Sequence, residues 1–322
     1  MKKTLAIGMD FGGTNCRFAL INRRAEVVAR VSCATNQVSQ PKEFMRWSKL
    51  AVTDLLAKAG CKKSSVAGLG MGLPGSVDAK RGLVHSLTNL PSWNNIQLAS
   101  LMKKNLNLPV SIDNDANAMA LGEFLHGAAK GSQNAIFLTL GTGIGGGLLI
   151  DGKLFNGHRF SAAEIGHMRW AGHPINCACG SRGCIETVVG NGYLLRRLKK
   201  DFKDKMPTKV KRAMLKDNQN QIKLEHITRA AKAGDVYSIR FWKEIGESLG
   251  DFLGGLCNML NPEVIVIGGG IMGAGSHIVN PLKTRLKACT FEQAYIGLKV
   301  VKAKLGVDAG LIGAANLILR KI

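Results

Sequence analysis

The chain has 322 residues, of which 46% are hydrophobic and 20% are charged. This composition can bury a large core, excludes an intrinsically disordered chain, and at this length favours two domains. Apolar runs fall short of the roughly 20 residues that a membrane-spanning helix needs, and no cleavage site follows the short run that ends at Asp10. We therefore expect a soluble, cytoplasmic protein with no membrane partner.

Lys and Arg outnumber Asp and Glu by 44 to 22, which gives a formal net charge of +22. The excess is concentrated in residues 196–223, where 11 basic and three acidic residues contribute +8. Aromatic residues make up 6% of the chain, and no basic cluster is interleaved with aromatic side chains that could stack on bases. A solvated helical face or a surface insertion is favoured over a surface that attracts polyanions, and nucleic acid is not the expected partner. The basic balance also suits a small anionic substrate such as ATP.

The predicted elements alternate between strands and helices along the chain. A strand over 5–9, a turn over 10–15 and a strand over 16–22 form an opening hairpin. Later strands are predicted over 66–73, 109–112 and 264–267, and helices over 44–59, 95–106, 116–126, within 192–260, and over 280–288 and 309–320. This alternation indicates an α/β protein with substantial parallel pairing.

A second glycine-containing hairpin follows 129 residues after the first. Residues 135–151 match residues 6–22 at five of 17 positions, and Gly141 stands where Gly12 stands in the first copy. The flanking strands have the same length in both copies. We infer that the chain duplicates one supersecondary unit.

Both hairpin turns have the composition of a phosphate-binding loop. Backbone N–H groups in turns rich in Gly and Thr can point at phosphate oxygens, because no Cβ atoms obstruct their approach. Asp10 adds a carboxylate beside the first turn, suited to orienting Mg²⁺ and its waters. Two ordinary tight hairpins are the alternative, which the presence of Thr in both turns makes less favoured.

Residues 268–273 spell GxGxxG directly after a predicted strand. This pattern gives weak support for a dinucleotide site, because the region about 20 residues further on lacks an acidic residue at a strand end. A glycine-rich turn that accepts an adenosine or a phosphate is the favoured interpretation. An NAD site and a purely structural turn are the alternatives.

The strongest single motif is His167 followed by Cys177, Cys179 and Cys184. Four ligands of these types within 18 residues are what tetrahedral Zn²⁺ takes, and a full set of protein ligands leaves no position for water. We therefore predict a structural zinc that holds the loop rigid. Free thiols and a redox pair are alternatives, the latter disfavoured by the C-x-C spacing. The other five cysteines are scattered and are interpreted as small core residues.

Asn114 and Asp115 follow the short strand predicted over 109–112. A carboxylate at a strand end beside a helix N-terminus is a candidate general base. The alternative is a helix N-cap, which Asn and Asp both favour. Together with two phosphate turns and a zinc loop flanked by Glu164 and Glu186, the base is the favoured interpretation.

The sequence resembles the ROK family of sugar kinases, and within it the bacterial glucokinases, over nearly its whole length. The likeness is carried by DFGGTN (10–15), GLPGSVD (72–78), TNLPSW (88–93), NDAN (114–117), LGTGIGGG (140–147), AEIGH (163–167), CACGSRGCIE (177–186) and NPEVIVIGGG (261–270). It implies a duplicated α/β fold of the actin-like ATPase, ribonuclease H-like type, with the sugar and ATP in a cleft between two domains. Residues 1–113 plus 306–322 would form the smaller domain. Residues 114–305 would form the larger one, with its zinc-binding loop over 167–184.

The resemblance also implies a role for each matching residue. Asp115 would be the catalytic base that takes the proton from the attacking sugar hydroxyl. The other sugar contacts would be Gly75, Asn89, Asn114, Glu164, His167 and Glu186, with His167 also a zinc ligand. The phosphates and Mg²⁺ would be held by Asp10, Gly12, Gly13, Thr14, Thr142 and Gly143, with Gly269 and Gly270 beside the adenosine. The expected activity is ATP-dependent phosphorylation of a hexose, glucose to glucose 6-phosphate, by a homodimer.

Several alternatives stay open at this point. Within the family, N-acetylmannosamine, fructose and allose are other acceptors, and polyphosphate is another donor. A sugar-responsive transcription repressor of the family would carry a helix-turn-helix before the first strand, and we expect no room for one before that strand begins near Thr4. A zinc hydrolase would need an open coordination position on the metal. These differences favour the kinase.

Overall fold

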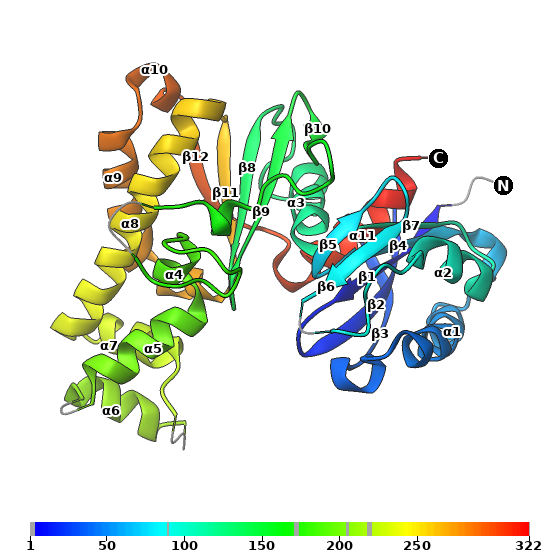
Figure 1. Ribbon diagram of the computed structural model, residues 1–322, viewed down its shortest axis with the longest axis horizontal. Coiled ribbons are helices and arrows are strands. Elements are labelled where there is room, and N and C mark those ends of the chain that lie inside the picture. Colours follow the sequence, from blue (N-terminus) through cyan, green and yellow to red (C-terminus); the bar gives the residue numbers. More distant parts are fainter. Residues whose placement is uncertain (1–3, 89, 171–173, 204–205, 218–220, 322) are drawn as a thin grey trace. The chain divides into compact units, whose positions relative to one another are not determined.

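The computed structural model describes residues 4–88, 90–170, 174–203, 206–217 and 221–321. The chain forms two compact units, each built from more than one stretch of sequence (Figure 1). The first comprises Met1–Gln133, Gly147–Ala163 and Ala303–Ile322, and the second comprises Asn134–Gly146 and Glu164–Lys302. None of the described helices is long and apolar enough to cross a membrane.

A five-stranded sheet in the order β3-β2-β1-β4-β7 forms the centre of the first unit. Its strands are β1 (Leu5–Phe11), β2 (Asn15–Asn22), β3 (Val27–Ala34), β4 (Val66–Leu73) and β7 (Val110–Asn114). β2 pairs antiparallel with β1 and β3, whereas β4 lies parallel to β1 and β7. The predicted opening hairpin and both later strands of this unit are confirmed. β3 is not among the predicted elements, because its side chains alternate only between partly buried and exposed.

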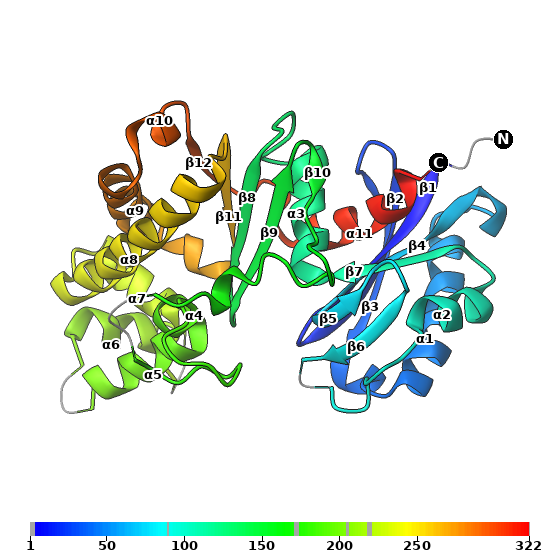
Figure 2. The same cartoon turned by 45° about the horizontal axis from the view of Figure 1, so that its top comes forward.

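Helices cover both faces of this sheet (Figure 2). On one face, α1 (Pro41–Lys58) and α2 (Leu98–Leu106) enclose a core that contains Met9 and Phe11. On the other face, α11 (Ala309–Leu319) packs directly on the strands. The close approach of α11 requires Gly8 and Gly70, where an added Cβ would lie 1.9 and 1.7 Å from carbonyl oxygens of α11. A small hairpin of β5 (Gly75–Asp78) and β6 (Leu83–Leu87) completes the unit, with short 3₁₀ turns η1 (Thr35–Val38), η2 (Lys63–Ser65) and η5 (Gly306–Asp308).

The helix α3 (Asp115–His126) also belongs to the first unit, whereas the domain boundary expected at residue 113 places it in the larger domain. Its packing against α11 explains the difference. At Gly313 an added Cβ would lie 1.6 Å from the carbonyl oxygen of Ala118, so the two helices are in backbone contact. The fully buried carboxylate of Glu123 accepts a hydrogen bond of 2.7 Å from the backbone N–H of Leu305, just before α11.

The second sheet has the order β10-β9-β8-β11-β12, which repeats the arrangement of the first. Its strands are β8 (Ala135–Leu140), β9 (Ile144–Ile150), β10 (Lys153–Leu154), β11 (Val264–Gly268) and β12 (Lys299–Lys302). In both sheets a glycine-turn hairpin is followed by two parallel strands. The duplication inferred from five identities is thus seen as a repeated topology.

The remaining helices all lie in the second unit. They are α4 (Glu186–Val189), α5 (Asn191–Asp201), α6 (Thr208–Leu215), α7 (Leu224–Lys232), α8 (Val236–Leu260), α9 (Ser276–Cys289) and α10 (Glu292–Tyr295), with η3 (Ile165–His167) and η4 (Gly270–Ala274). The long α8 packs against α9 beside β11 and β12 (Figure 1). Gly246 and Gly250 allow this, because an added Cβ there would lie about 2.5 Å from carbonyl oxygens of α9.

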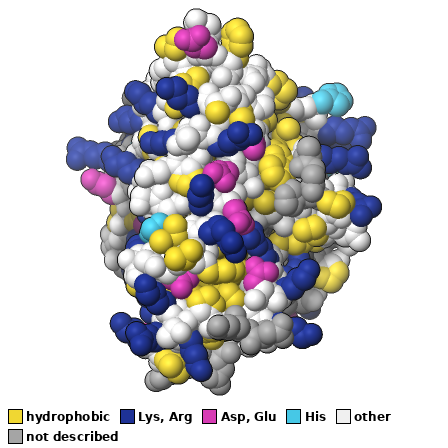
Figure 3. All heavy atoms as spheres, turned by 90° about the vertical axis from the view of Figure 1, so that its left-hand side faces the viewer, with side chains coloured by type: hydrophobic (Ala, Val, Ile, Leu, Met, Phe, Trp, Pro, Cys, Tyr) yellow, Lys and Arg dark blue, Asp and Glu magenta, His cyan; other side chains and the backbone are white. Residues whose placement is uncertain are grey.

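The basic residues of this unit do not form one continuous patch on the face that Figure 3 shows. Lys and Arg side chains are spread over it, with acidic and hydrophobic side chains between them. In the basic stretch, Arg197 pairs with Glu244. Arg196 lies 4.2 Å above the ring of Tyr193. Both arginines therefore have partners within their own unit, and the role of the basic stretch stays a prediction.

Candidate active site

The first glycine turn, residues 12–14, follows β1 and is held from below by Thr35. The Thr35 hydroxyl donates to the carbonyl oxygen of Gly12 at 2.6 Å, and its N–H donates to the carbonyl oxygen of Thr14 at 2.9 Å. Gly13 and Thr14 are exposed, and a Cβ added at Gly13 would meet nothing within 4 Å. The upper face of the turn is therefore open to a ligand while its base is fixed.

Asp10 is the last but one residue of β1 and is almost fully buried beside this turn. Its carboxylate forms an ion pair with Arg17 and lies next to Gly310, in the first turn of α11. Burial raises the pKa of Asp10 above its ordinary value, and the guanidinium of Arg17 acts in the opposite direction. A buried anion with one cationic partner is suited to accept a further cation or the waters that surround it.

Asn114 and Asp115 stand where β7 ends and α3 begins. The side-chain oxygen of Asn114 accepts from the N–H groups of Ala116 at 2.9 Å and Asn117 at 3.2 Å, so Asn114 is the N-cap of α3. Its amide nitrogen donates to the carbonyl oxygen of Gly75 at 3.1 Å. The cap alternative thus holds for Asn114. It leaves Asp115 as the first helical residue, partly exposed, with one carboxylate oxygen 2.9 Å from the N–H of Ala116.

A second carboxylate, which the sequence reasoning does not assign, supports this corner. Asp113 is almost fully buried and accepts from the N–H of Asn114 at 2.8 Å and from the side chain of Asn117 at 3.0 Å. Burial raises its pKa, and these hydrogen bonds lower it. Asp113 therefore fixes the residues on either side of Asp115. The predicted sugar contact Asn89 lies outside the described residues.

The second glycine turn, residues 141–143, is braced by Glu186 at the start of α4. One oxygen of this carboxylate accepts from the N–H of Ile144 at 2.8 Å, and a Cβ added at Gly143 would lie 2.4 Å from the same oxygen. The N–H of Asn191 donates to the carbonyl oxygen of Gly141 at 3.0 Å. The structure thus brings Glu186 to the turn that contains Thr142 and Gly143.

The four residues of the predicted zinc loop come together. We call His167, Cys177, Cys179 and Cys184 the cysteine cluster; their ligand atoms all lie within 4.8 Å of one another. The Cys179 and Cys184 sulfurs are 3.7 Å apart, as are the Cys177 sulfur and His167 Nδ1. Zn–S bonds of about 2.3 Å at tetrahedral angles place two sulfurs about 3.8 Å apart. The donor set and its spacing therefore fit Zn²⁺.

The backbone around the cluster forms a compact knuckle. The N–H of Cys177 donates to the carbonyl oxygen of Ser181 at 2.8 Å, and Gly180 and Gly183 adopt positive φ angles of 88° and 80°. The hydroxyl of Tyr193, on α5, accepts from the N–H of Ala178 at 3.0 Å. The knuckle is in this way tied to α5, whose first residue, Asn191, donates to Gly141 of the second glycine turn.

Glu164 is exposed and immediately precedes η3, whose last residue is His167. The carbonyl oxygen of Glu164 accepts from the N–H of His167 at 3.0 Å, so the backbone of Glu164 is tied to a residue of the cysteine cluster. His167 itself is partly exposed.

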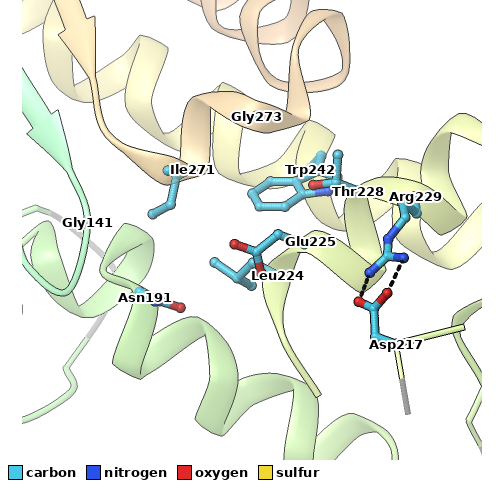
Figure 4. A pocket seen from close by; sticks show the side chains of 11 residues that line it. Gly141, Asn191, Asp217, Leu224, Glu225, Thr228, Arg229, Trp242, Ile271 and Gly273 are labelled. Atoms are coloured by element: carbon cyan, nitrogen blue, oxygen red, sulfur yellow. Dashed lines mark hydrogen bonds and ion pairs between the residues drawn. The ribbon is translucent and has the colours of Figure 1, made fainter. Parts of the chain in front are cut away.

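The glycines after β11 have two different roles. Gly269 has a φ of 94°, and an added Cβ would lie 2.1 Å from the carbonyl oxygen of Leu140, so only glycine fits between β11 and the end of β8. Gly270 lines a pocket of about 520 Å³ (Figure 4), within the range of small-molecule sites. Gly141 also lines this pocket, so the pocket adjoins the second glycine turn.

We call this cavity the Trp242 pocket. Figure 4 shows Trp242 and Ile271 above, Leu224 and Glu225 below and Asn191 at the lower left. Trp242 is fully buried, and its indole N–H and the side-chain oxygen of Asn191 have no hydrogen-bond partner within the described chain. No local sequence motif marks the wall that α7 and α8 contribute to this pocket.

An ion pair forms one end of the Trp242 pocket. Both guanidinium nitrogens of Arg229 donate to the carboxylate of Asp217, which also accepts from Nε2 of the buried His226 at 3.2 Å. Nδ1 of His226 accepts from the N–H of Lys223 at 3.1 Å, so its proton lies on Nε2. These bonds hold the pKa of Asp217 at about 2, chiefly through Arg229.

Two sheets of identical strand order, each opening with a glycine-turn hairpin, define the actin-like ATPase type of fold. The chain belongs to the ROK family, whose profile matches residues 6–321. A glucokinase from Thermotoga maritima is 32% identical over 322 residues, covering all of this chain and 99% of that one.

Two further relatives bear on function. The crystal structure of a ROK family glucokinase from Streptomyces griseus in complex with glucose and AMPPNP has a TM-score of 0.82 at 30% identity, covering 98% of this chain and 99% of that one. A xylose repressor from Caldicellulosiruptor bescii is 31% identical over 314 residues, covering 97% of this chain and 77% of the repressor. The family therefore contains relatives with different functions at similar identity.

Proposed function

We propose that the protein phosphorylates a hexose with ATP, and that glucose, converted to glucose 6-phosphate, is its substrate. The observation that carries this proposal is the corner at the start of α3, where Asp115 directly follows Asn114, which caps the helix and donates a hydrogen bond to the carbonyl oxygen of Gly75. A carboxylate, an amide and a backbone carbonyl at one helix N-terminus suit a polyhydroxylated ring. The similarity to glucokinases along the whole chain supports the same assignment.

In the proposed mechanism, Asp115 accepts the proton of the attacking hydroxyl as its oxygen bonds to the γ-phosphorus of ATP, while the bond from that phosphorus to the β,γ-bridging oxygen breaks and ADP leaves. The carboxylate of Asp115 is partly exposed and so is accessible to a substrate hydroxyl. The other hydroxyls are assigned to the residues that the family resemblance implies: Gly75, Asn89, Asn114, Glu164, His167 and Glu186. Such contacts fix which hydroxyl is in line with the phosphate.

The donor side is proposed to bind the nucleoside in the Trp242 pocket, next to Gly270, with Gly269 shaping the turn. The phosphates are assigned to the two glycine turns, through Gly12, Gly13 and Thr14 in one and Thr142 and Gly143 in the other. Asp10 is assigned to Mg²⁺ through its waters. Phosphoryl transfer has a loose transition state, so alignment and charge neutralisation matter more than covalent chemistry.

The cysteine cluster is proposed to hold a structural Zn²⁺. Four protein ligands leave the ion no open position, so it supplies rigidity to the knuckle and no Lewis-acid chemistry. His167 is then fixed beside Glu164, and the knuckle beside Tyr193 of α5. This is the support that exposed sugar contacts on a loop need.

A coupled assay of ADP release tests the proposal. Glucose, mannose, fructose, allose, N-acetylglucosamine and N-acetylmannosamine are compared as acceptors with ATP as donor. With polyphosphate as donor no ADP is released, so the sugar phosphate formed is measured directly by mass spectrometry. The highest kcat/KM is expected for glucose with ATP. A higher value for N-acetylmannosamine or fructose would replace glucose but keep the kinase, whereas no turnover with any sugar would refute it. Light scattering tests whether the enzyme is the expected homodimer.

A sugar-responsive repressor is the second candidate, favoured by the xylose repressor relative and the net charge of +22. DNA binding by such a protein weakens steeply with salt. A gel-shift experiment at physiological salt, with and without glucose or xylose, distinguishes the two. A sequence-specific shift released by sugar would favour the repressor.

A further inference from the structure

Cys16 and Cys33 face each other across the antiparallel pair formed by β2 and β3. They are directly opposed in the register of the two strands, so their side chains lie on the same face of the sheet. Cys16 is fully buried, Cys33 is partly exposed, and both pack in the core beneath α1. Neither belongs to the cysteine cluster, and both are free thiols.

This placement satisfies the geometric demand of a disulfide. Directly opposed residues of an antiparallel pair have Cα atoms about 4.5 or 5.5 Å apart, and disulfides span Cα separations of about 4.4 to 6.8 Å. The thiols already interact: the pKa of Cys33 is lowered chiefly by a hydrogen bond from Cys16, whose own pKa burial raises. Cys33 is thus the exposed, more acidic member of the pair, and Cys16 its buried neighbour.

The pair lies at the base of the first glycine turn. Cys16 comes directly after Asn15, whose carbonyl oxygen accepts from the N–H of Gly12 at 3.0 Å and closes the turn. Cys33 is two residues before Thr35, which holds Gly12 and Thr14 from below. A new covalent link here draws together the two strand ends that position the turn.

We propose that Cys16 and Cys33 are a redox pair that forms a reversible disulfide and thereby weakens phosphate binding by the first glycine turn. With hydrogen peroxide as oxidant, the Cys33 thiolate attacks one oxygen, the O–O bond breaks, and a sulfenic acid and hydroxide form. The Cys16 sulfur then bonds to the Cys33 sulfur, hydroxide leaves, and the Cys16 proton converts it to water. Two thiols lose two electrons and the peroxide gains them. A small thiol such as dithiothreitol reverses the change.

The chemical part is tested on the full-length protein with its metal bound. After brief exposure to peroxide, free thiols are alkylated and peptides are mapped by mass spectrometry. A linked peptide containing Cys16 and Cys33, lost on reduction, is the expected result. Recovery of both residues as separately alkylated thiols, at a peroxide dose that oxidises Cys61 or the cysteine cluster, overturns the proposal.

The functional part rests on the proposed kinase activity. The KM for MgATP should rise by between about threefold and a hundredfold on oxidation, with the KM for glucose unchanged. Dithiothreitol should restore it. Cys33→Ser should keep the basal KM and lose the response, whereas Cys61→Ser, also partly exposed, should respond like the natural protein. A response that persists in Cys33→Ser belongs to the cysteine cluster and overturns the proposal.

If no sugar is phosphorylated, the kinase proposal fails but the disulfide is still tested by peptide mapping. Calorimetry with AMPPNP then replaces the kinetics. Weaker binding after oxidation, absent in Cys33→Ser, is the expected result. Equal affinity before and after formation of the linked peptide overturns the effect on phosphate binding.

Discussion

The carboxylate of Asp10, on β1, forms an ion pair with the guanidinium of Arg17, on β2. The two residues are directly opposed and form the second pair of the register, counted from the turn that joins the strands. Arg17 also donates to the carbonyl oxygen of Val307 at 3.1 Å, in η5, just ahead of α11. Asp10 therefore lies among a cation, a helix N-terminus and an open glycine turn. Even so, burial outweighs these neighbours and raises the pKa of Asp10. The carboxylate is thus destabilised in the free protein, and a bound cation relieves that cost.

The first prediction concerns the pH dependence of stability in Asp10→Asn. The pKa of Asp10 in the folded protein lies above its ordinary value of 3.8. The contribution of Asp10 to the free energy of unfolding is therefore full below pH 3.8 and is lost as the pH rises through the pKa of the folded protein. The variant should therefore unfold at a higher temperature than the natural protein at pH 7. The difference should disappear towards pH 3.8.

Thermal unfolding of both proteins from pH 4 to pH 8, without nucleotide, measures this difference in unfolding temperature. The same variant should lose phosphoryl transfer by about a hundredfold, the scale of losing one preorganised electrostatic contact. A stability difference that stays constant over the pH range contradicts the linkage argument.

The second prediction tests the base. Asp115→Asn keeps a side chain that can occupy the first position of α3, and Asn114 still caps the helix. The variant should therefore fold and bind glucose, while kcat falls by at least about a hundredfold. Single-turnover kinetics and glucose calorimetry measure the two effects. Asp54→Asn, on the exposed side of α1, is the control. Turnover near that of the natural protein would remove Asp115 from the role of base.

Local patterns were sufficient wherever the interacting residues lie close together in the sequence. The His167 and Cys184 ends of the cysteine cluster are 17 residues apart, and a helix N-cap needs only its own helix. Glycine turns can likewise be recognised from the sequence, because their backbone conformation requires the one residue that has no Cβ.

Other features could not be read from local patterns because they depend on long-range packing. The Trp242 pocket joins α7, α8 and the turn after β11, which are distant in the chain. The conformation of Gly269, which is predicted to lie beside an adenosine, is also required by the backbone of Leu140 at the end of β8, a contact that only the sheet order reveals.

The third prediction concerns the metal. Removing zinc with a chelator should leave three thiols and an imidazole without their shared cation and lower the thermal midpoint. Cys179→Ser should do the same with less metal bound, measured by elemental analysis. Cys289→Ser, at the end of α9 and outside the cluster, should keep a full complement of zinc. Freshly purified protein that contains no zinc refutes the assignment.

The fourth prediction concerns the ion pair at the end of the Trp242 pocket. The pKa of Asp217 is lowered from its ordinary value of 3.8 to about 2. The stabilisation from the ion pair is therefore complete above pH 3.8 and is lost as the pH falls through 2. The pair is therefore intact at every pH at which activity is measured. Arg229→Met should raise the Kd for ATP several-fold at pH 7, because the turn before α7 loses its anchor beside Leu224 and Glu225.

Intrinsic fluorescence follows this binding, since Trp242 lines the pocket. Asp217→Asn should weaken binding to a similar extent, and the double variant should be no worse than either single one, because both remove the same pair. Arg240→Met, on the exposed side of α8, is the matched control. Fully additive effects contradict the proposed coupling.

The fifth prediction uses the contact that positions α3. An added Cβ at Gly313 would lie 1.6 Å from the carbonyl oxygen of Ala118, so Gly313→Ala must push α3 away from α11. Overpacking of this kind costs about 1–3 kcal/mol of unfolding free energy. Because Asp115 is the first residue of α3, the displacement should lower kcat more than the loss of stability alone explains. Urea unfolding and kinetics at a temperature where both proteins are folded separate the two effects.

Gly255→Ala provides the control with the opposite sign. Gly255 lies within α8, and an added Cβ there would meet nothing within 4 Å. Replacing a helical glycine with alanine should therefore stabilise the protein by up to about 1 kcal/mol and leave kcat unchanged. If Gly313→Ala is equally benign, the backbone contact between α3 and α11 is not what positions Asp115.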